Sequence, residues 1–539
     1  MTRKVWIFFV LLALIAGTAS GQSATDARTV LQNSMKAMGG TDLKTLQYSG
    51  AGWSSMIGQT FGLAEDWPHY EVADYTRTID YDAKTSREDY TRRQGTYPTL
   101  GRVPMPETRV TAILSGGYAW DVQGTNVVPQ PGLYLYGVPY ADLRQLELVL
   151  TPHGFLKAAL AASDAAAISL PIVGPSDFGL SQNGRKVTVV SFTMLNGKYK
   201  VNGTINDQNL VELVDIWFPN PIYGDMDYEM RYTQYKDWGG GVMFPGLVHV
   251  HQGDPRLNPA HNYYEYRVSS VKPNLAVPAT PVPDAVRSAT APPVRVESTK
   301  LADGVWLLAG GTHNSLLVEF RDYVAVVEAP QNEERSLAVI AEAQKLAPNK
   351  VVQYVVNTHH HFDHAGGLRT FMAMGTTIVT QETNKDYYID ILFHPGDWHL
   401  KPDIFAKFNP MYMISRRPAP IDVVGKKYVI TDGARELQVL QVRDVAYELG
   451  DPSYRQGNHS ADMLMVYLPK EKVLFNADLY TPPAQGAQPP ATPTPGMRTL
   501  FQNIRLQKLD VTQHVPAHGR VGMQDEFVKL VGITTTSSN

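Results

Sequence analysis

The segment Asn357-Thr358-His359-His360-His361-Phe362-Asp363-His364-Ala365-Gly366-Gly367 contains four histidines and an aspartate, and it directly follows the apolar run Val351–Val356. The run is typical of a buried strand, so the segment is predicted to be a loop at the end of that strand. Imidazole nitrogens beside a carboxylate are the ligands that zinc prefers. Because side chains two residues apart in an extended loop point the same way, His359 and His361 are predicted to bind the same metal ion.

The rest of the segment extends the metal-binding pattern. Asp363 and His364 are predicted to turn toward a second ion, whereas His360 faces the opposite side and is not expected to be a ligand. The pattern H-x-H-x-D-H followed by Ala-Gly-Gly, in the register that starts at His359, resembles the signature of the metallo-β-lactamase superfamily. A single motif is weak evidence, so further ligands should follow later in the chain.

Three further ligand residues occur downstream, in the order that the resemblance requires. His459 comes just before an apolar run, Asp478 ends the next run, and His518 follows a third. Short apolar runs bordered by such residues are expected of strands that end in loops at one edge of a sheet. The resemblance therefore implies that all three side chains reach the same site.

The same resemblance implies an α/β fold, the αββα sandwich, over residues 297–539, with two zinc ions per chain. It assigns seven ligands, three to one ion, three to the other and one that bridges both: His359, His361 and His459; Asp363, His364 and His518; and Asp478. Many relatives have an aspartate in place of Glu328. In those relatives the aspartate supports the histidine loop without being a metal ligand itself. Glu328 is expected to brace the loop in the same way, with a longer side chain.

The chemistry of such a site is hydrolytic. Two zinc ions about 3.5–4 Å apart hold a water between them and lower its pKa toward about 7. The resemblance implies a metal-bridging hydroxide that attacks the substrate, with Asp363 as the catalytic residue that orients it and moves its proton. Tyr480, two residues after Asp478, is a second catalytic candidate, because lactonases of the superfamily have a tyrosine near that point. The alternative interpretation of Tyr480 is a tyrosine packed in the core.

We therefore predict a metal-dependent hydrolase that cleaves a carboxylic ester, lactone or amide of a small-molecule substrate. The bridging Asp478 resembles that of lactonase-, glyoxalase II- and phosphotriesterase-like members more than the β-lactamases, which lack it. A β-lactamase and a phospho- or sulfo-ester hydrolase are the alternatives. An alternative of another class is a periplasmic protein that binds a lipid or another hydrophobic ligand. An open apolar cavity in the N-terminal sheet would favour that function.

Composition excludes several functions. The 539 residues are 43% hydrophobic and 19% charged, as in soluble globular proteins, and they are too many for a single core. A net charge of −4 gives no basic footprint, so nucleic-acid binding is not expected. The absence of cysteine excludes disulfides and zinc sites built on thiolates.

The first residues have the pattern of an export signal. Arg3 and Lys4 precede the apolar stretch Val5–Ala16, and small residues around Gly21 offer a cleavage point, which predicts a signal peptide over residues 1–21. The alternative is a retained membrane anchor, although the stretch is short for a bilayer. We predict a periplasmic or secreted protein without stable membrane insertion after removal of the signal. No motif indicates the oligomeric state.

The remaining chain divides into parts with different patterns. Residues 22–271 begin with a helix capped by Asp26 and continue as strand-like runs, which predicts a mainly antiparallel β domain (α+β) with a half-barrel-like sheet. Residues 272–296 are rich in proline and alanine and are predicted to be an extended linker. From residue 297 to residue 539 strands alternate with helices, and Glu333–Leu346 is predicted to be an amphipathic helix.

Three of the histidines outside the motifs bear on metal or substrate binding. His249 and His251 alternate on a predicted strand, and without a third ligand nearby in the sequence we do not expect them to bind a metal. His313 lies where relatives place a loop near the mouth of the site. A binding role is therefore one interpretation of His313, and a structural role is the other.

Overall fold

The computed structural model describes seven ranges of the chain: residues 26–95, 106–171, 186–253, 261–392, 398–408, 420–443 and 458–532. The predicted export signal, residues 1–21, lies outside these ranges. Within them, no helix combines the length and the apolar character needed to span a membrane.

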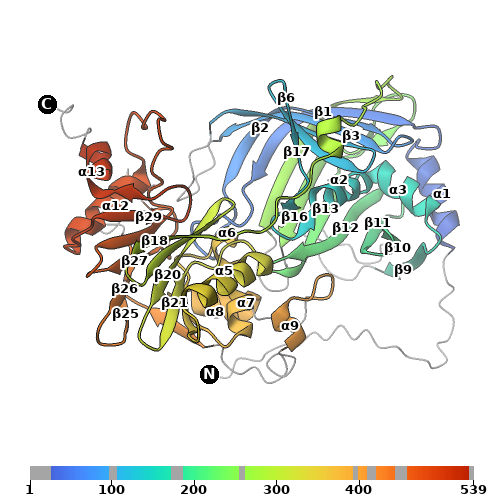
Figure 1. The fold of residues 1–539 in the computed structure, drawn as a ribbon. Coiled ribbons are helices and arrows are strands. Elements are labelled where there is room, and N and C mark those ends of the chain that lie inside the picture. Colours follow the sequence, from blue (N-terminus) through green and yellow to red (C-terminus); the bar gives the residue numbers. More distant parts are fainter. Residues whose placement is uncertain are drawn as a thin grey trace, which may run out of the picture.

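The N-terminal part is one large antiparallel sheet, drawn in blue to green in Figure 1. Among the described residues thirteen strands form it, in the order β6-β5-β4-β3-β2-β1-β17-β16-β13-β12-β11-β10-β9. Their bounds are β1 Thr45–Ser55, β2 His69–Asp80, β3 Thr85–Gln94, β4 Thr108–Ser115, β5 Tyr118–Gln123, β6 Asn126–Pro129, β9 Ala166–Pro171, β10 Lys186–Met194, β11 Tyr199–Ile205, β12 Val211–Asn220, β13 Gly224–Thr233, β16 Leu247–Gly253 and β17 His261–Pro273. The predicted mainly antiparallel domain is confirmed.

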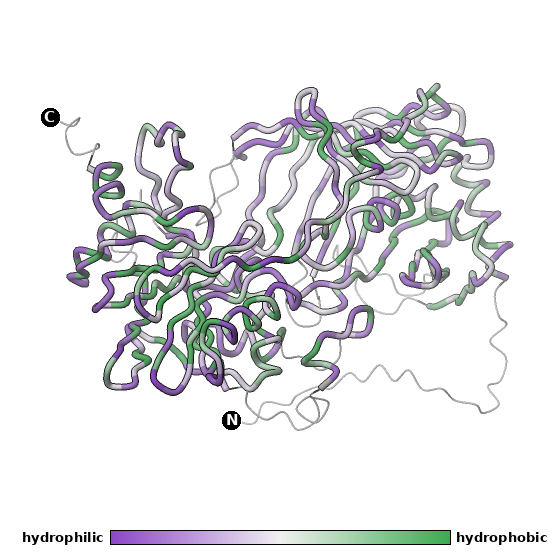
Figure 2. The backbone as a smooth tube through the Cα atoms, viewed as in Figure 1, coloured by the Kyte–Doolittle hydropathy of each residue, from purple (hydrophilic) through white to green (hydrophobic). Residues whose placement is uncertain are grey.

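Helices cover one face of this sheet and share its core: α1 (Ala27–Ala37), α2 (Tyr140–Val149) and α3 (Pro152–Ala161). Asp26 caps α1 as predicted, because its carboxylate accepts the backbone N–H groups of Arg28 and Thr29. Residues alternate between buried and half-buried along β13, as expected of a strand with one face on a core, and Figure 2 shows hydrophilic and hydrophobic stretches mixed along the sheet. Two short strand pairs complete this part: β7 (Leu133–Tyr134) with β8 (Val138–Pro139), and β14 (Lys236–Asp237) with β15 (Met243–Phe244).

The proline- and alanine-rich segment after β17 packs on the N-terminal sheet. Its short helix α4 (Asp284–Arg287) buries Val286 against Ile113 and Trp120. The hydroxyl of Ser115 donates a 2.6 Å hydrogen bond to the backbone carbonyl of Thr280. The segment is therefore held against the sheet over part of its length.

The C-terminal part contains two sheets, drawn in yellow to red in Figure 1. The seven-stranded sheet consists of β18 Glu297–Ala302, β19 Val305–Gly310, β20 His313–Glu319, β21 Tyr323–Val327, β22 Val351–Val356, β23 Thr377–Gln381 and β24 Ile421–Val424. The six-stranded sheet consists of β25 Lys427–Thr431, β26 Glu436–Gln441, β27 Leu464–Leu468, β28 Val473–Ala477, β29 Gln513–Pro516 and β30 Gly522–Met523. The helical segments are α5 Glu333–Leu346, α6 Phe362–Ala365, α7 Leu368–Ala373, α8 Asn384–Tyr387, η1 Tyr388–Leu392, α9 Ile404–Phe408, α12 Pro495–Leu506 and α13 Gln524–Gly532.

The two sheets pack face to face, with helices on the outside. In β20, Leu316 and Val318 join a core shared with the six-stranded sheet, whereas Leu317 joins the core under α5. This alternation is that of a strand buried on both faces. The predicted αββα arrangement is confirmed, and α5 has the bounds predicted for the amphipathic helix.

We predict that acid destabilises the N-terminal core through His153. Its side chain is fully buried, its Nε2 atom lies 3.0 Å from the carbonyl oxygen of Met38, and burial lowers its pKa from 6.5 to about 4. Between pH 6.5 and about pH 4 the unfolded chain binds a proton on His153 that the folded chain does not, so the free energy of unfolding falls as the pH falls. The expected loss of the free energy of unfolding approaches about 3 kcal/mol near pH 4. Urea unfolding of the unchanged protein and of His153→Gln at pH 7 and pH 5 measures it. His399→Gln, on an exposed side chain, should keep the pH dependence of the unchanged protein.

Candidate metal centre

The loop that holds most of the candidate ligands follows β22, which is parallel to β21 and β23. The last two residues of β22, Val355 and Val356, are buried, so the strand fixes where the loop begins. The amide of Asn357 donates a 2.7 Å hydrogen bond to the carbonyl oxygen of His359 and accepts one of 2.6 Å from the hydroxyl of Tyr388. These hydrogen bonds hold the start of the loop in place.

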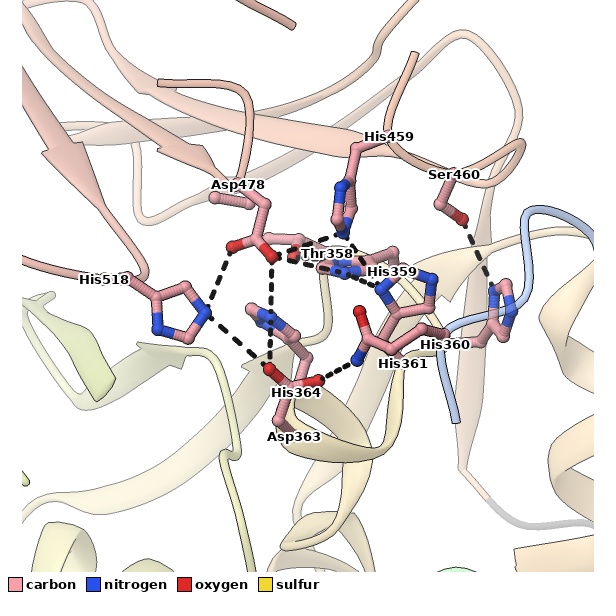
Figure 3. Close-up of polar contacts among 12 residues, drawn as sticks. Thr358, His359, His360, His361, Asp363, His364, His459, Ser460, Asp478 and His518 are labelled. Atoms are coloured by element: carbon pink, nitrogen blue, oxygen red, sulfur yellow. Dashed lines mark hydrogen bonds and ion pairs between the residues drawn. The ribbon is translucent and has the colours of Figure 1, made fainter. Parts of the chain in front are cut away.

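Three imidazoles converge in a first group (Figure 3). The Nδ1 atom of His361 lies 3.0 Å from Nε2 of His359 and 3.0 Å from Nε2 of His459. Burial, followed by the neighbouring histidines, lowers the pKa of His359 and of His361 well below the ordinary value. Both imidazoles are therefore neutral, which is the form that binds a metal ion.

Asp478 lies beside this group and reaches further (Figure 3). Its Oδ2 atom is 3.3 Å from Nε2 of His459 and 3.2 Å from Nε2 of His364. Its Oδ1 atom is 3.4 Å from Nε2 of His518. Burial would raise the pKa of Asp478, but the histidines around it, His364 above all, lower it. Asp478 is therefore an ionised carboxylate with an oxygen toward each end of the cluster.

A second group forms around Asp363. Its Oδ2 atom lies 3.4 Å from Nε2 of His364, 3.7 Å from Nε2 of His518 and 3.2 Å from Nε2 of His313. The structure thus brings together all seven residues that the resemblance assigns as ligands, and it adds His313. The position of His313 favours the binding interpretation over the structural one.

Glu328 braces the histidine loop, as expected from its place in the sequence. Its side chain is fully buried; Oε2 lies 2.7 Å from Nδ1 of His364, and Oε1 accepts a 2.9 Å hydrogen bond from the backbone N–H of Thr358. A proton held on Nδ1 leaves Nε2 of His364 free to face the cluster. Glu328 has a φ of 74°, so the backbone is constrained where the carboxylate turns toward the loop.

The loop between β1 and β2 belongs to the N-terminal part and still contacts this centre. The carbonyl oxygen of Thr60 lies 2.8 Å from Nε2 of His361 and accepts its hydrogen, which leaves Nδ1 of His361 facing the cluster. The amide Nε2 of Gln59 donates a 2.8 Å hydrogen bond to Oδ1 of Asp363. Sequence motifs do not reveal either residue, because the contacts join positions about three hundred residues apart.

The same loop is fitted closely to the C-terminal part. The carbonyl oxygen of Phe61 accepts a 2.8 Å hydrogen bond from the backbone N–H of Ala461. Gly58 has a φ of 76°, and a Cβ atom there would lie 2.3 Å from Cγ of Phe362. Only glycine therefore lets this loop approach the histidine loop so closely.

His360 faces away from the cluster, as predicted. Its Nδ1 atom lies 2.8 Å from Oδ1 of Asp462, and its Nε2 atom lies 2.7 Å from the hydroxyl oxygen of Thr60. Both ring nitrogens are therefore used in hydrogen bonds, and neither is available to an ion.

Tyr480 packs in the core, which favours the packed interpretation over the catalytic one. Its side chain is 1% exposed and packs against Phe527 and His514, with ring centroids 4.7 and 5.5 Å away. The backbone has a φ of 46° at Ala477, where β28 ends. Beyond this turn Asp478 enters the cluster and Tyr480 returns to the core.

Replacing Tyr480 by phenylalanine should leave zinc content and hydrolysis unchanged. The hydroxyl is buried and has no hydrogen-bond partner among the described residues, so its removal costs no contact. The free energy of unfolding should stay the same or rise by about 1 kcal/mol, because a buried unpaired hydroxyl is unfavourable. Elemental analysis and urea unfolding measure both quantities. A fall in kcat without a fall in stability would instead restore the catalytic role.

The donor atoms of the cluster fit metal ions. Nε2 of His364 and Oδ1 of Asp478 are buried and have no hydrogen-bond partner within the described part of the chain. Buried polar atoms without partners are costly, and a bound cation would remove that cost. Imidazole nitrogens and carboxylate oxygens are the donors that zinc prefers.

Comparisons with known proteins find a family match in the C-terminal part. Residues 308–515, which include the histidine loop, His459 and Asp478, match the model of the metallo-beta-lactamase superfamily. A solved metallo-beta-lactamase from Pontibacter korlensis is 19% identical, with 45% of this chain and 100% of that chain covered and a TM-score of 0.31. One from Hirschia baltica is 19% identical, with 44% and 98% covered and a TM-score of 0.30. FIM-1 from Pseudomonas aeruginosa is 16% identical, with 45% and 96% covered and a TM-score of 0.30.

No curated protein matches the chain. The family model covers the segments that carry His313, the histidine loop, His459 and Asp478, and it ends before His518. Residues 308–515 of this chain therefore match the metallo-beta-lactamase superfamily, and the C-terminal part has the αββα fold.

Proposed function

We propose that the protein is a zinc hydrolase with two metal ions per chain that cleaves a carboxylic ester, a lactone or an amide of a small-molecule substrate. The observation that carries the proposal is the position of Asp478. One of its oxygens faces His459 and His364, and the other faces His518. A carboxylate in this position suits a bridge between two ions, one held by each group of ligands.

Bound ions would supply Lewis-acid activation of the substrate and a nucleophile at neutral pH. The protein's own contribution begins with Asp363, whose Oδ1 atom is fixed by Gln59. Burial opposes ionisation of Asp363, but His364 and the hydrogen bond from His313 hold its pKa well below the ordinary value. Asp363 therefore remains an ionised hydrogen-bond acceptor inside the cluster, as a group that orients the nucleophile must.

The exposure of the ligands indicates where a substrate enters. The side chain of His518 is 31% exposed, whereas those of His359 and His364 are fully buried. Tyr136, from the N-terminal part, lies edge-on to His313 with ring centroids 6.3 Å apart. We infer that the substrate approaches past His518 and that Tyr136 contributes to the wall of its pocket.

Proton release by the zinc-loaded protein tests the reaction. Proton release is measured on a panel of lactones, simple esters, amides, β-lactams, phosphotriesters and sulfate esters. The unchanged protein is compared with His459→Ala, which lacks a ligand of the first group. We expect turnover of lactones, esters or amides that is lost in the variant. Turnover of β-lactams or phosphorus or sulfur esters alone would contradict the proposed bond type. Absence of turnover with two zinc ions bound in the cluster of His359, Asp363 and Asp478 would contradict the proposed activity.

Export is part of the proposal, because the pattern at residues 1–21 is that of a signal peptide. Mass spectrometry of the protein from fractionated cells gives the mature N-terminus and the compartment. A mature chain that begins near residue 22 outside the cytoplasm is expected. An intact Met1 in the cytoplasm would exclude export.

A second candidate function concerns the N-terminal part. A cavity of about 700 Å³ lies between the sheet and helices α2 and α3. Its wall includes Leu114, Leu148, Phe192 and Met194. A cavity of this size and apolar lining suits a hydrophobic small molecule. This observation supports binding of a hydrophobic ligand by the N-terminal sheet, beside or in place of the hydrolase activity.

Filling the cavity tests that candidate. Ala158 lines it, so Ala158→Trp should remove binding of a fluorescent fatty acid and leave hydrolysis unchanged. Ala285→Trp, at an exposed position, is the matched control and should bind as the unchanged protein does. Equal binding by all three proteins would exclude the cavity as the ligand site.

A further inference from the structure

Two histidines of β16 face each other on the side of the N-terminal sheet away from its helices. Val248 and Val250 of the same strand are buried in the core, so His249 and His251 between and beyond them point to the opposite face. Their side chains are 21% and 19% exposed, so solvent and small ions reach them. β16 lies between β13 and β17 near the middle of the sheet (Figure 1).

Each histidine uses its Nδ1 atom to contact a carboxylate. Nδ1 of His249 is 3.0 Å from Oε2 of Glu265, and Nδ1 of His251 is 3.1 Å from Oε1 of Glu229. An ionised carboxylate can accept hydrogen bonds but cannot donate them. Both Nδ1 atoms therefore carry the proton of the neutral ring. Both Nε2 atoms therefore present a lone pair.

These lone pairs point at each other and at a third acceptor. The two Nε2 atoms are 2.9 Å apart, and Oδ1 of Asn262 is 3.0 Å from Nε2 of His249. The amide of Asn262 cannot turn round, because its Nδ2 atom donates a 2.6 Å hydrogen bond to Asp66. Three acceptor atoms thus meet with no hydrogen between them.

A proton on the imidazole of His249 would relieve this arrangement, but its surroundings oppose it. Burial, and then the neighbouring His251, lowers the pKa of His249. A metal cation satisfies all three acceptors at once. The spacing also agrees, since the ligand atoms of the first group of the catalytic cluster are 3.0 Å apart. A histidine whose other nitrogen is held by a carboxylate is the usual form of a metal-binding histidine.

We propose that His249, His251 and Asn262 form a further metal site, outside the catalytic cluster, for a divalent transition-metal ion such as zinc. Glu265 and Glu229 orient the two imidazoles toward the ion. Two imidazoles and an amide oxygen suit zinc, copper or nickel better than magnesium or calcium. Water fills the remaining positions, because both histidines are partly exposed.

Zinc binding by the full-length protein tests the site. The protein is stripped of metal, dialysed against Zn²⁺ and analysed for zinc per chain. We expect the variant His249→Ala/His251→Ala to bind one zinc fewer than the unchanged protein. His399→Ala, which removes an exposed histidine, should bind as much as the unchanged protein. The experiment is repeated with His459→Ala, which removes a ligand of the catalytic cluster, added to every protein. The variant His249→Ala/His251→Ala should again bind one zinc fewer than its parent, and this result separates the proposed site from the cluster.

Chemical modification gives a test that needs no variant of the site. Diethyl pyrocarbonate is applied to the unchanged protein with and without Zn²⁺, and modified histidines are located by mass spectrometry. Zinc should protect His249 and His251 and leave His399 as reactive as before. Equal zinc content in all variants, or reactivity of the pair that zinc does not change, would overturn the proposal. The pair would then be two imidazoles that share a proton.

Discussion

Replacing Asp478 by alanine should abolish hydrolysis and lower the zinc content of the protein. Asp478 is the only carboxylate among the described residues with an oxygen toward His459 and another toward His518, so its loss separates the two groups. We expect kcat/KM to fall by about a thousandfold or more, because metal-assisted charge stabilisation is worth several kcal/mol and about 1.4 kcal/mol is a factor of ten. The rate on the best substrate of the panel and the zinc per chain measure the effect.

The controls for this variant separate charge from fold. Asp322→Ala removes an exposed carboxylate from the same part of the chain and should change neither quantity. Asp478→Asn keeps the size of the side chain but removes the negative charge, and it should lose activity almost as fully as alanine does. Full activity in Asp478→Asn would show that the carboxylate is not a bridging ligand.

Replacing the loop between β1 and β2 should weaken metal binding even though the loop supplies no ligand. A short glycine-serine turn in place of residues 58–62 removes the carbonyl of Thr60 from His361 and the amide of Gln59 from Asp363, and it keeps Asp66 in contact with Asn262. Loss of partners that orient metal ligands typically costs about 10- to 100-fold in metal affinity. Competition with a zinc chelator measures the affinity, and Gln59→Ala alone should give a smaller loss in the same direction.

A turn elsewhere in the N-terminal sheet provides the matched control. Residues 195–198 join β10 to β11 and can be replaced by the same glycine-serine turn. This variant should bind zinc with the same affinity as the unchanged protein. A similar loss in both loop variants would attribute the effect to general destabilisation of the N-terminal part rather than to the contacts with His361 and Asp363.

The ligands of the centre are predictable from the sequence because each lies close to an end of a strand. A strand fixes the positions of the residues that border it: His359 and Asp478 follow β22 and β28, and His459 lies a few residues before β27, so these short motifs carry their geometry with them. Tyr480 shows the limit of this reasoning. Spacing alone does not reveal the turn at Ala477, and that turn sends Tyr480 into the core.

Contacts between distant parts of the chain are the other limit. Gln59, Thr60 and Tyr136 lie in turns with no motif, and their role depends on how the N-terminal sheet docks beside the histidine loop. The role proposed for His249 and His251 is also hidden in the sequence, because the third acceptor, Asn262, comes from the neighbouring strand β17. A strand pattern predicts that a sheet exists, but the pairing of its strands decides which side chains meet.

The loop around Gly58 also bears on how the protein matures. The ribosome makes this loop first, and the histidine loop that it contacts follows about three hundred residues later. Domains generally fold as units in the order of their synthesis, so the N-terminal sheet can present a finished surface when the ligands emerge. A chain whose N-terminal sheet fails to fold would then hold zinc weakly. Tight metal loading would mark the chains in which both parts have folded and docked.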